Sequence, residues 1–281
     1  MSAITVAERP DGVAVLTFDQ PGSKANVLTR ELWAEFGAAL ADLTPRTDLK
    51  GLVLASAKAG IFIAGADLKL LANANRANDP EVRAFIEQGL RVLEQLEALP
   101  FPTCAAIDGA ALGGGLEVAL ACDYRVCGTN PKVQLGLPEV KLGLIPGWGG
   151  TQRLPRIIGI RQAASVITSG SALSRLEAEG LDLVLTTVGS ELLLDRCAGY
   201  VVGTSPGVWS ETRASKHRPT PTSGELSQPD STAAAEAVRV MTEGAALPLY
   251  DAIKLETEAF MRLAGSDESK RLIGEFFARR K

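Results

Sequence analysis

The chain has 281 residues, of which 46% are hydrophobic and 22% charged, a profile typical of a globular protein with enough apolar residues for a sizeable core. Its formal net charge of -4 argues against general nucleic-acid binding and against a basic membrane-surface protein. The absence of long apolar runs and of a basic, then apolar, N-terminus excludes a transmembrane helix and a secretory signal as sequence patterns.

Segments with strand periodicity alternate with helical patterns through the first two thirds of the chain. Apolar alternation and β-branched residues predict strands at 3–9, 12–18, 50–55, 61–63, 103–107, 124–127, 132–135 and 183–188. Helical spacing predicts helices at 28–43, from 67, at 82–99, after the glycines 113–115, and at 152–169, 173–180 and 191–202. Thr29 and Asp67 are the expected N-caps of the first two. This order predicts an α/β fold with a mainly parallel sheet.

The composition changes to Pro, Ser, Thr and Gly over residues 203–231, which predicts a linker or a long surface loop. Three further helices are expected at 233–242, 246–263 and 267–280, the last with Ser266 as its N-cap. We therefore predict a catalytic core over residues 1–202, the linker or loop over 203–231 and a C-terminal helical region over 232–281.

Cysteine and histidine usage limits the chemistry that the chain can carry out. The four cysteines form no CxxC pair and lie mostly in apolar surroundings, which favours reduced thiols in a cytoplasmic protein without a zinc site. The single histidine, His217, lies in the predicted linker, where we expect it to be solvated. Acid–base chemistry is then left to carboxylates, Lys, Tyr or backbone dipoles.

Two turns of small residues are candidates for binding an anion through backbone amides. Gly113, Gly114 and Gly115 lead into a helix, and residues 63–67 form a second such turn between a strand and a helix. Neither has the GxGxxG or GK[ST] spacing of a nucleotide-binding loop. The local pattern fits two explanations equally well for the first turn: an oxyanion site, or a tight turn that permits close helix packing.

Two isolated carboxylates interrupt apolar, glycine-rich segments. Glu117 lies in the first turn of its predicted helix among apolar neighbours, and Glu139 follows Pro138. Each could serve simply as a capping or solvated residue. Together, beside two amide turns and without histidine chemistry, they favour a general acid–base pair whose pKa values are raised by desolvation. The segment 147–150 has two interpretations: Trp148 lines a wall of the pocket, or the segment is simply the loop that leads into the next helix.

At these residues the sequence resembles the enoyl-CoA hydratase/isomerase (crotonase) superfamily. The similarity is carried by Phe62–Lys69, by Ala106–Asp123, and by Leu137–Glu139 with Leu144–Leu154. It covers residues 3–185 and resumes at 260–280, and it is strongest toward the hydratase halves of bacterial multifunctional fatty-acid oxidation α subunits. Those proteins continue into a dehydrogenase domain before which this chain stops, so we expect either a free-standing hydratase or one part of such an enzyme.

The resemblance implies a spiral of ββα units whose C-terminal helices form a trimerisation or cap region, and a homotrimer or a dimer of trimers. It implies that the amides of Ala66 and Gly114 bind the thioester oxygen, that Glu117 activates a water and that Glu139 donates a proton to C2. It also implies an acyl-CoA substrate in fatty-acid β-oxidation, no metal or other cofactor, and a dehydrogenase domain or thiolase as companion. The implied substrate contacts are Lys24, Ala64, Gly65, Asp67, Leu68, Lys69 and Trp148.

Three functions are therefore open from the sequence. The first is hydration of trans-2-enoyl-CoA, favoured because both glutamates are present. The second is a Δ3,Δ2-enoyl-CoA isomerase or a dehydratase on the same fold. The third is a non-catalytic acyl-CoA-binding or assembly module, which would need neither glutamate. The sequence departs from the family at 180–188 and has no counterpart for 203–231, so the far wall of the pocket and the helical cap are left unassigned.

Overall fold

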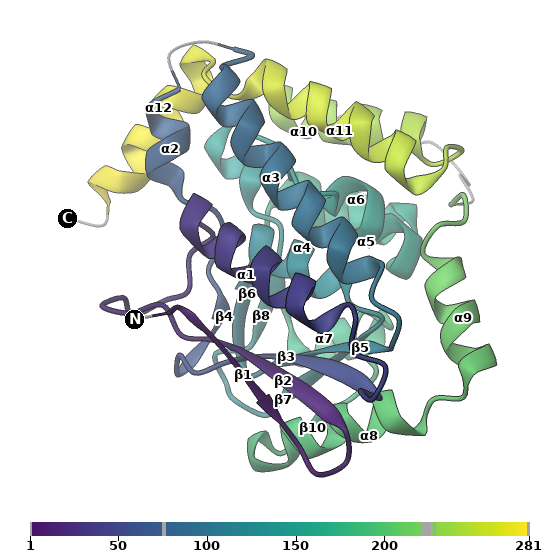
Figure 1. Cartoon of the computed structure of the whole chain (residues 1–281). Helices are drawn as coiled ribbons and strands as arrows, with labels where there is room; N and C mark the ends of the chain where they lie inside the picture. The colour runs from purple at the N-terminus through teal and green to yellow at the C-terminus, as the bar shows by residue number, and fades with distance from the viewer. Residues whose placement is uncertain (1, 75–76, 221–225, 227–228, 280–281) are drawn as a thin grey trace.

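The computed structural model describes residues 2–74, 77–220, 226 and 229–279, and Figure 1 shows two sheets surrounded by helices. The larger sheet has the strand order β1 (Ile4–Glu8), β2 (Val13–Phe18), β3 (Gly51–Ser56), β5 (Thr103–Ile107), β7 (Tyr124–Gly128) and β10 (Thr187–Val188). The smaller sheet has the order β4 (Gly60–Ile63), β6 (Gly109–Leu112), β8 (Gln134–Gly136) and β9 (Leu173–Ser174). Among the strand pairs of the described residues, β1–β2 and β8–β9 are antiparallel and the others are parallel.

The helices fill the intervals between strands and then close the chain. Between strands lie α1 (Arg30–Leu43), α2 (Leu68–Ala72), α3 (Pro80–Glu97), α4 (Gly114–Ala121), the 3-10 helix η1 (Glu139–Leu142), α5 (Gly150–Ile158), α6 (Ile160–Ser169) and α7 (Arg175–Gly180). After β10 come the 3-10 helix η2 (Ser190–Leu192), α8 (Leu193–Gly203), α9 (Pro206–Ser215), α10 (Thr232–Gly244), α11 (Leu249–Leu263) and α12 (Asp267–Ala278). The expected N-caps Thr29, Asp67 and Ser266 each accept a hydrogen bond from an amide of the first helical turn.

Successive strand pairs divide between the two sheets, which produces the spiral of the crotonase fold. In the pairs β3–β4, β5–β6 and β7–β8, the first strand joins the larger sheet and the second joins the smaller one. Each pair is followed by helices, so every ββα unit advances both sheets by one strand. The predicted fold class is therefore confirmed, including the C-terminal helices, which lie across one end of the molecule in Figure 1.

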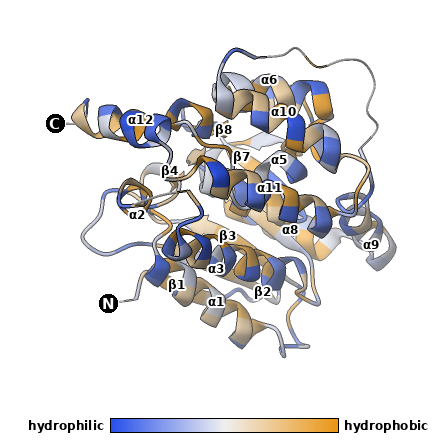
Figure 2. Ribbon diagram, turned by 90° about the horizontal axis from the view of Figure 1, so that it is seen from above, coloured by the Kyte–Doolittle hydropathy of each residue, from blue (hydrophilic) through white to orange (hydrophobic). Residues whose placement is uncertain are grey.

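Both faces of the larger sheet are covered, because its strands alternate side chains between two apolar clusters. Ala14 and Leu16 of β2 belong to the main core under α1, whereas Val13 and Val15 pack in a second cluster with α8. Burial on both faces is the usual state of a parallel sheet. Along the covering helices, hydrophobic and hydrophilic residues alternate, as Figure 2 shows for α1 and α3. In the described part of the chain, no helix has the length and apolar character needed to span a membrane.

Four local predictions need correction. The segment 203–231 is not loop throughout, because α9 occupies part of it; residues 221–225 and 227–228 lie outside the described residues. The predicted set of strands omits β6, which residues 109–112 form. The single helix predicted at 152–169 is divided into α5 and α6 at Gly159, whose φ of 84° no helix accommodates. The strand predicted at 183–188 is limited to β10.

Helix α9 is held against the rest of the fold by hydrogen bonds and an ion pair of its polar side chains. Arg213 forms an ion pair with Asp123 (2.7 Å), and Trp209 Nε1 donates to the same carboxylate (3.1 Å). Just beyond the helix, Lys216 is buried and its Nζ donates to the carbonyl of Ala121 (2.6 Å). The neighbouring His217, which we expected to be solvated, is half-buried with its ring 5.5 Å from that of Tyr250.

Candidate active site

The first amide turn connects β4 to α2. Gly65 has a φ of 108°, which only glycine adopts without strain, and Asp67 accepts from Lys69 N as the cap of α2. A parallel bridge fixes the turn from one side, because Leu28 N donates to Gly65 O (2.9 Å) and Asp67 N donates to Leu28 O (3.0 Å). The amide of Ala66 lies between these bonds and has no acceptor in the described part of the chain. It is therefore available to a ligand.

The second amide turn connects β6 to α4 and lies beside the first. Strands β4 and β6 are parallel neighbours, with Ile63 in register with Ala111, so their carboxyl ends bring the two turns together. Gly113 has a φ of 54° and donates to Gly136 O (2.8 Å). Gly114 opens α4, and among the described residues its amide has no acceptor. A helix N-terminus and two free amides form a site for a developing oxyanion.

No side chain fits at the second turn. A Cβ on Gly114 would lie 2.5 Å from Cζ3 of Trp148, and one on Gly115 would lie 2.1 Å from Ile63 O. Both distances are shorter than real contacts, so the glycines permit close approach of the helix to β4 and to Trp148. The two explanations that the sequence left open, close packing and amide exposure, therefore both apply.

Glu117 is buried in the first turn of α4 with an unusual pair of donors. Trp148 N and Gly150 N both donate to its Oε1, each at 2.7 Å. Burial raises the pKa of Glu117 well above its ordinary range, and the charges of Glu256 and Glu139 add to this, while the two amide hydrogen bonds oppose it. Since both donors contact Oε1, the second carboxylate oxygen is left for a water or a substrate.

Glu139 lies at the start of η1, next to the second amide turn. Its Oε1 is 2.7 Å from the position that a Cβ on Gly113 would take. Its Oε2 is buried without a hydrogen-bond partner in the described part of the chain. Burial raises the pKa of Glu139 to about 8, and the charge of Glu256 contributes to the increase. The backbone amide of Glu139 itself opposes this increase, but a carboxyl group with one buried oxygen that lacks a donor is still poised to hold a proton near neutral pH.

A cavity of about 330 Å³ joins the two turns and the two glutamates. Ten of the eleven predicted site residues line it: Ala64, Gly65, Ala66, Asp67, Leu68, Lys69, Gly114, Glu117, Glu139 and Trp148. Lys24 is exposed and is not among the lining residues, although the adjacent Ala25 is. The structure thus assembles the predicted site and leaves Lys24 outside its wall.

Trp148 forms a rigid wall of this cavity. Its Nε1 donates to Ile86 O (3.0 Å), and its ring meets those of Trp33 and Phe85 edge-on, with centroids 5.1 and 5.2 Å apart. Such contacts restrict the ring and stabilise it beyond simple area burial. The predicted pocket wall is therefore a packed aromatic cluster.

Several lining residues were not found from the sequence. Phe260, Phe276 and Phe277 come from α11 and α12, more than 100 residues beyond the motifs, and they make one side of the cavity apolar. Helix α12 lies against α2 (Figure 1), which carries the Lys69 side of the pocket. Nothing in the local pattern of these phenylalanines distinguishes a pocket wall from a core face.

The third buried carboxylate, Glu256 on α11, was also missed. It is fully buried and accepts hydrogen bonds from Gly149 N, Thr151 N and Thr151 Oγ1. Burial raises the pKa of Glu256 to about 7, against the opposing effect of these bonds. The sequence spacing could have revealed it: Ile253, Glu256 and Phe260 are spaced by three and four residues, which places Glu256 on the buried face of the helix. Among the described residues, no group of His, Cys, Asp or Glu side chains is arranged to hold a metal ion.

Comparison with known proteins agrees with this geometry. The sequence model described as "Enoyl-CoA hydratase/isomerase" matches residues 8–200. The chain belongs to the enoyl-CoA hydratase/isomerase family. A curated relative, the fatty acid oxidation complex subunit alpha of Shewanella halifaxensis (strain HAW-EB4), is 46% identical over 189 residues, which are 67% of this chain. The aligned region is 26% of that relative, so the chain spans about a quarter of its length.

Solved structures of the family superimpose over nearly the whole chain. An enoyl-CoA hydratase from Bacillus anthracis is 29% identical with a TM-score of 0.68, covering 100% of this chain and 97% of that one. The human mitochondrial delta3-delta2-enoyl-CoA isomerase has a TM-score of 0.77 at 23% identity, covering 99% and 98%. At that identity the second comparison supports the fold only. The protein is thus a crotonase-fold member of an enzyme family that includes both reactions by name.

Proposed function

We propose that the protein is an enoyl-CoA hydratase, which adds water across the 2,3 double bond of a trans-2-enoyl-CoA to give a 3-hydroxyacyl-CoA. The observation that carries this proposal is the meeting on one cavity of the buried Glu117, of Glu139 with its buried Oε2, and of two amides that have no acceptor among the described residues. Hydration needs all four: a base for the water, an acid for C2 and two donors for the enolate oxygen.

The amides of Ala66 and Gly114 would hold the thioester carbonyl oxygen. When water oxygen bonds to C3, the electrons of the C2–C3 double bond move toward the thioester and place negative charge on that oxygen. Fixed donors stabilise this charge without reorganisation, and one such donor contributes about 2.7–4 kcal/mol in other enzymes. When C2 takes a proton, the electron pair on the enolate oxygen re-forms the thioester carbonyl, so no net oxidation or reduction occurs. The proposed reaction accordingly calls for no redox cofactor or metal.

The surroundings of the two glutamates support different roles. Burial raises the pKa of Glu117, but its two amide donors oppose that rise and favour the ionised form, which removal of a proton from the water requires. Glu139 has no donor on Oε2 and a pKa of about 8, which suits a neutral acid that protonates C2. Each turnover leaves a proton on Glu117 and removes one from Glu139, and exchange with solvent restores the starting state.

The substrate would enter past α2 and α12. Lys69 is exposed at the cavity and places a positive charge where the CoA phosphates would lie, with Ala64, Gly65, Asp67 and Leu68 beside it and Lys24 farther out. The acyl chain would extend between Trp148 and the phenylalanines of α11 and α12. The apolar wall fits a fatty-acyl chain and so a role in β-oxidation.

The assay of Glu139→Gln tests the proposal. We expect the variant to lose about 10²–10⁴-fold in kcat on crotonyl-CoA or a longer trans-2-enoyl-CoA, because the general acid is removed while the side-chain shape is kept. Far-UV circular dichroism should be unchanged. The matched control is Glu87→Gln, on the exposed face of α3, which should behave as wild type. A wild-type rate in Glu139→Gln would refute the assignment.

A second reaction of the same site, Δ3,Δ2-enoyl-CoA isomerisation, is favoured by the family description, which includes isomerases. Isomerisation moves a proton between C2 and C4 and needs one carboxylate rather than two. Supplying 3-enoyl-CoA and 2-enoyl-CoA in parallel separates the two activities, and the reverse assay on 3-hydroxyacyl-CoA measures dehydration. Binding of acyl-CoA without turnover at any chain length would instead indicate an assembly module.

The cellular setting is also a proposal. The relative is a subunit of a fatty acid oxidation complex by name, which supports a dehydrogenase domain or a thiolase as companion. Family membership supports a homotrimer or a dimer of trimers, to be measured by light scattering. Four buried, unpaired cysteines fit a reducing compartment such as the cytoplasm.

A further inference from the structure

Glu256 lies behind the wall of the site and not on it. It belongs to α11, is 0% exposed, and is not among the residues that line the cavity. A buried carboxylate is costly unless it is hydrogen-bonded for a purpose. Its position, 105 to 107 residues from the backbone groups that it binds, makes that purpose a tertiary one.

Residues 148–151 divide their amides between two carboxylates. Trp148 N and Gly150 N donate to Glu117, while Gly149 N and Thr151 N donate to Glu256 at 2.5 and 2.7 Å. Four consecutive amides thus point alternately toward α4 and toward α11. The φ of 94° at Gly149 allows this path, and Thr151 Oγ1 adds a third bond to Glu256 at 2.6 Å.

This arrangement makes the position of Glu117 dependent on Glu256. The two amides that donate to Oε1 of Glu117 lie on segment 148–151, and Glu256 accepts hydrogen bonds from the same segment on its opposite side. Without the hydrogen bonds to Glu256, the amides of Gly149 and Thr151 would be buried without an acceptor, and the segment would have to rearrange. Movement of the segment would move both donors of Glu117 and the ring of Trp148 with them.

We propose that Glu256 is a positioning residue for the reaction, which holds segment 148–151 so that its alternate amides orient the catalytic carboxylate Glu117 toward the substrate. This inference rests on the proposed function, since it needs a reaction in which Glu117 takes part. Glu256 touches no substrate in this arrangement and acts only through the segment and through its charge.

The charge of Glu256 provides a readout that a purely structural anchor would lack. The charged groups that face it are Glu117 on α4, Glu139 on η1 and Arg153 on α5, the last opposing the two carboxylates. A negative Glu256 raises the pKa of both catalytic glutamates. Neutralising it should therefore lower both values and displace the activity profile toward lower pH.

The experiment compares Glu256→Gln and Glu256→Asp in the full chain, with trans-2-enoyl-CoA as substrate. We expect Glu256→Gln to lower kcat about 10²-fold through misplacement of Glu117, with a smaller change in KM. Its kcat/KM profile should also move by about one unit toward lower pH. Glu256→Asp keeps the charge but shortens the side chain, so it should lower kcat without displacing the profile.

Glu258→Gln is the matched control, because it makes the same change two residues along α11 at a surface pair with Arg83. It should leave both kcat and the profile at wild type. A Glu256→Gln enzyme with the wild-type profile overturns the inference, even if its thermal stability falls. An inactive wild type refutes the proposed function instead, and the inference falls with it.

A second pair of variants applies if Glu256→Gln does not fold. Thr151→Val removes the hydroxyl donor to Glu256 and keeps the side-chain shape, whereas Thr151→Ser keeps the donor. We expect Thr151→Val to have the lower kcat of the two by at least severalfold. Equal rates in both variants would overturn the inference.

Discussion

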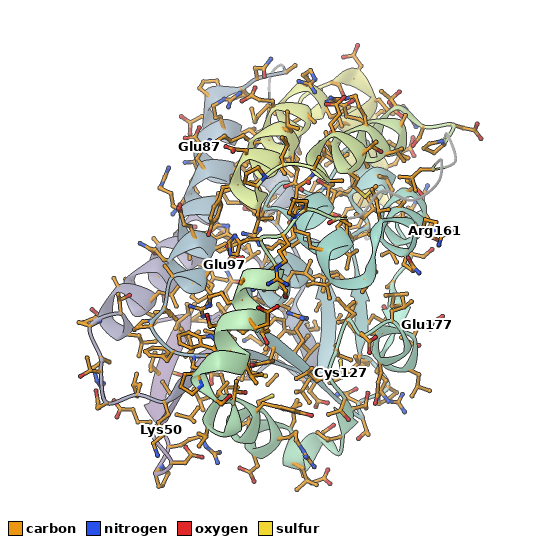
Figure 3. The ribbon with its side chains drawn as sticks, turned by 90° about the vertical axis from the view of Figure 1, so that its right-hand side faces the viewer. Lys50, Glu87, Glu97, Cys127, Arg161 and Glu177 are labelled. Atoms are coloured by element: carbon orange, nitrogen blue, oxygen red, sulfur yellow. The ribbon has the colours of Figure 1, made fainter. Side chains whose placement is uncertain are left out.

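The buried ion pair between Glu97 and Arg153 allows a quantitative test of how the site is supported. Both side chains are 2% exposed, and two bonds of 2.9 Å join the guanidinium to the two carboxylate oxygens. Figure 3 labels Glu97 in the interior, at the end of α3. Arg153 also donates to Trp148 O at 2.6 Å, so the pair holds the same segment that the two carboxylates bind.

Replacing Glu97 with Gln leaves the guanidinium of Arg153 buried without its counter-charge. Removing one partner of such a pair costs about 3–5 kcal/mol in other proteins. Lys216 Nζ, 4.0 Å from Glu97 and 7% exposed, would keep its bonds to the carbonyls of Ala121 and Cys122 but lose its ion-pair partner, which places the expected loss toward the upper end. At about 2–4 °C per kcal/mol for a chain of this size, the melting temperature should fall by roughly 6–20 °C.

Urea unfolding followed by circular dichroism measures this loss, at one fixed protein concentration because association would contribute to stability. Glu94→Gln, an exposed position one turn earlier on α3, is the control and should stay within about 0.5 kcal/mol of wild type. The double variant Glu97→Gln with Arg153→Met should recover part of the loss, because it leaves no uncompensated guanidinium. A stability equal to that of Glu94→Gln would refute the reasoning.

Two further predictions concern the site itself. Gly114→Ala would place a Cβ 2.5 Å from the packed ring of Trp148. We therefore expect the free energy of unfolding to fall by about 1–3 kcal/mol and kcat to fall about 10²–10³-fold. The control is Gly199→Ala in α8, which has open space around it and should leave kcat unchanged and stability equal or higher. The second concerns pH: since the pKa of Glu139 rises from 4.5 to about 8 on folding, the folded state binds more protons between these values, and stability should fall as pH rises through that window. Glu139→Gln should flatten this part of the stability curve, and an unchanged slope between pH 5 and 8 would contradict the assignment of a raised pKa.

The parts of the site that follow from sequence are those with a local chemical signal. Glu117 and Glu139 could be predicted because a charged residue among apolar neighbours is unusual over a few positions. The amide turns could be predicted because glycine and small residues between a strand and a helix leave backbone groups accessible. Both glutamates and both turns contribute residues to the lining of the cavity.

What could not be predicted depends on contacts between distant segments. Strand β6 consists of Gly109, two alanines and Leu112, which have no strand preference, and it is a strand because β4 and β8 pair with both of its edges. Helix α9 lies in a stretch of linker-like composition and is ordered by the bonds of Arg213 to Asp123. Tertiary pairing decides both cases, and no window of a few residues contains it.

Glu256 is the clearest case of a residue whose chemistry depends on packing. Its own neighbours in sequence predict only the buried face of a helix, and its function arises because α11 passes behind the segment 148–151. That segment is held on every side: its amides by Glu117 and Glu256, its carbonyl at Trp148 by Arg153, and the indole by Ile86 O. Since one rigid segment orients the base, forms the pocket wall and connects α3, α4 and α11, substitutions at any of its supports should lower stability and turnover together. A support variant that lost stability but kept full turnover and an unchanged pH profile would mean that Glu117 is oriented by α4 alone.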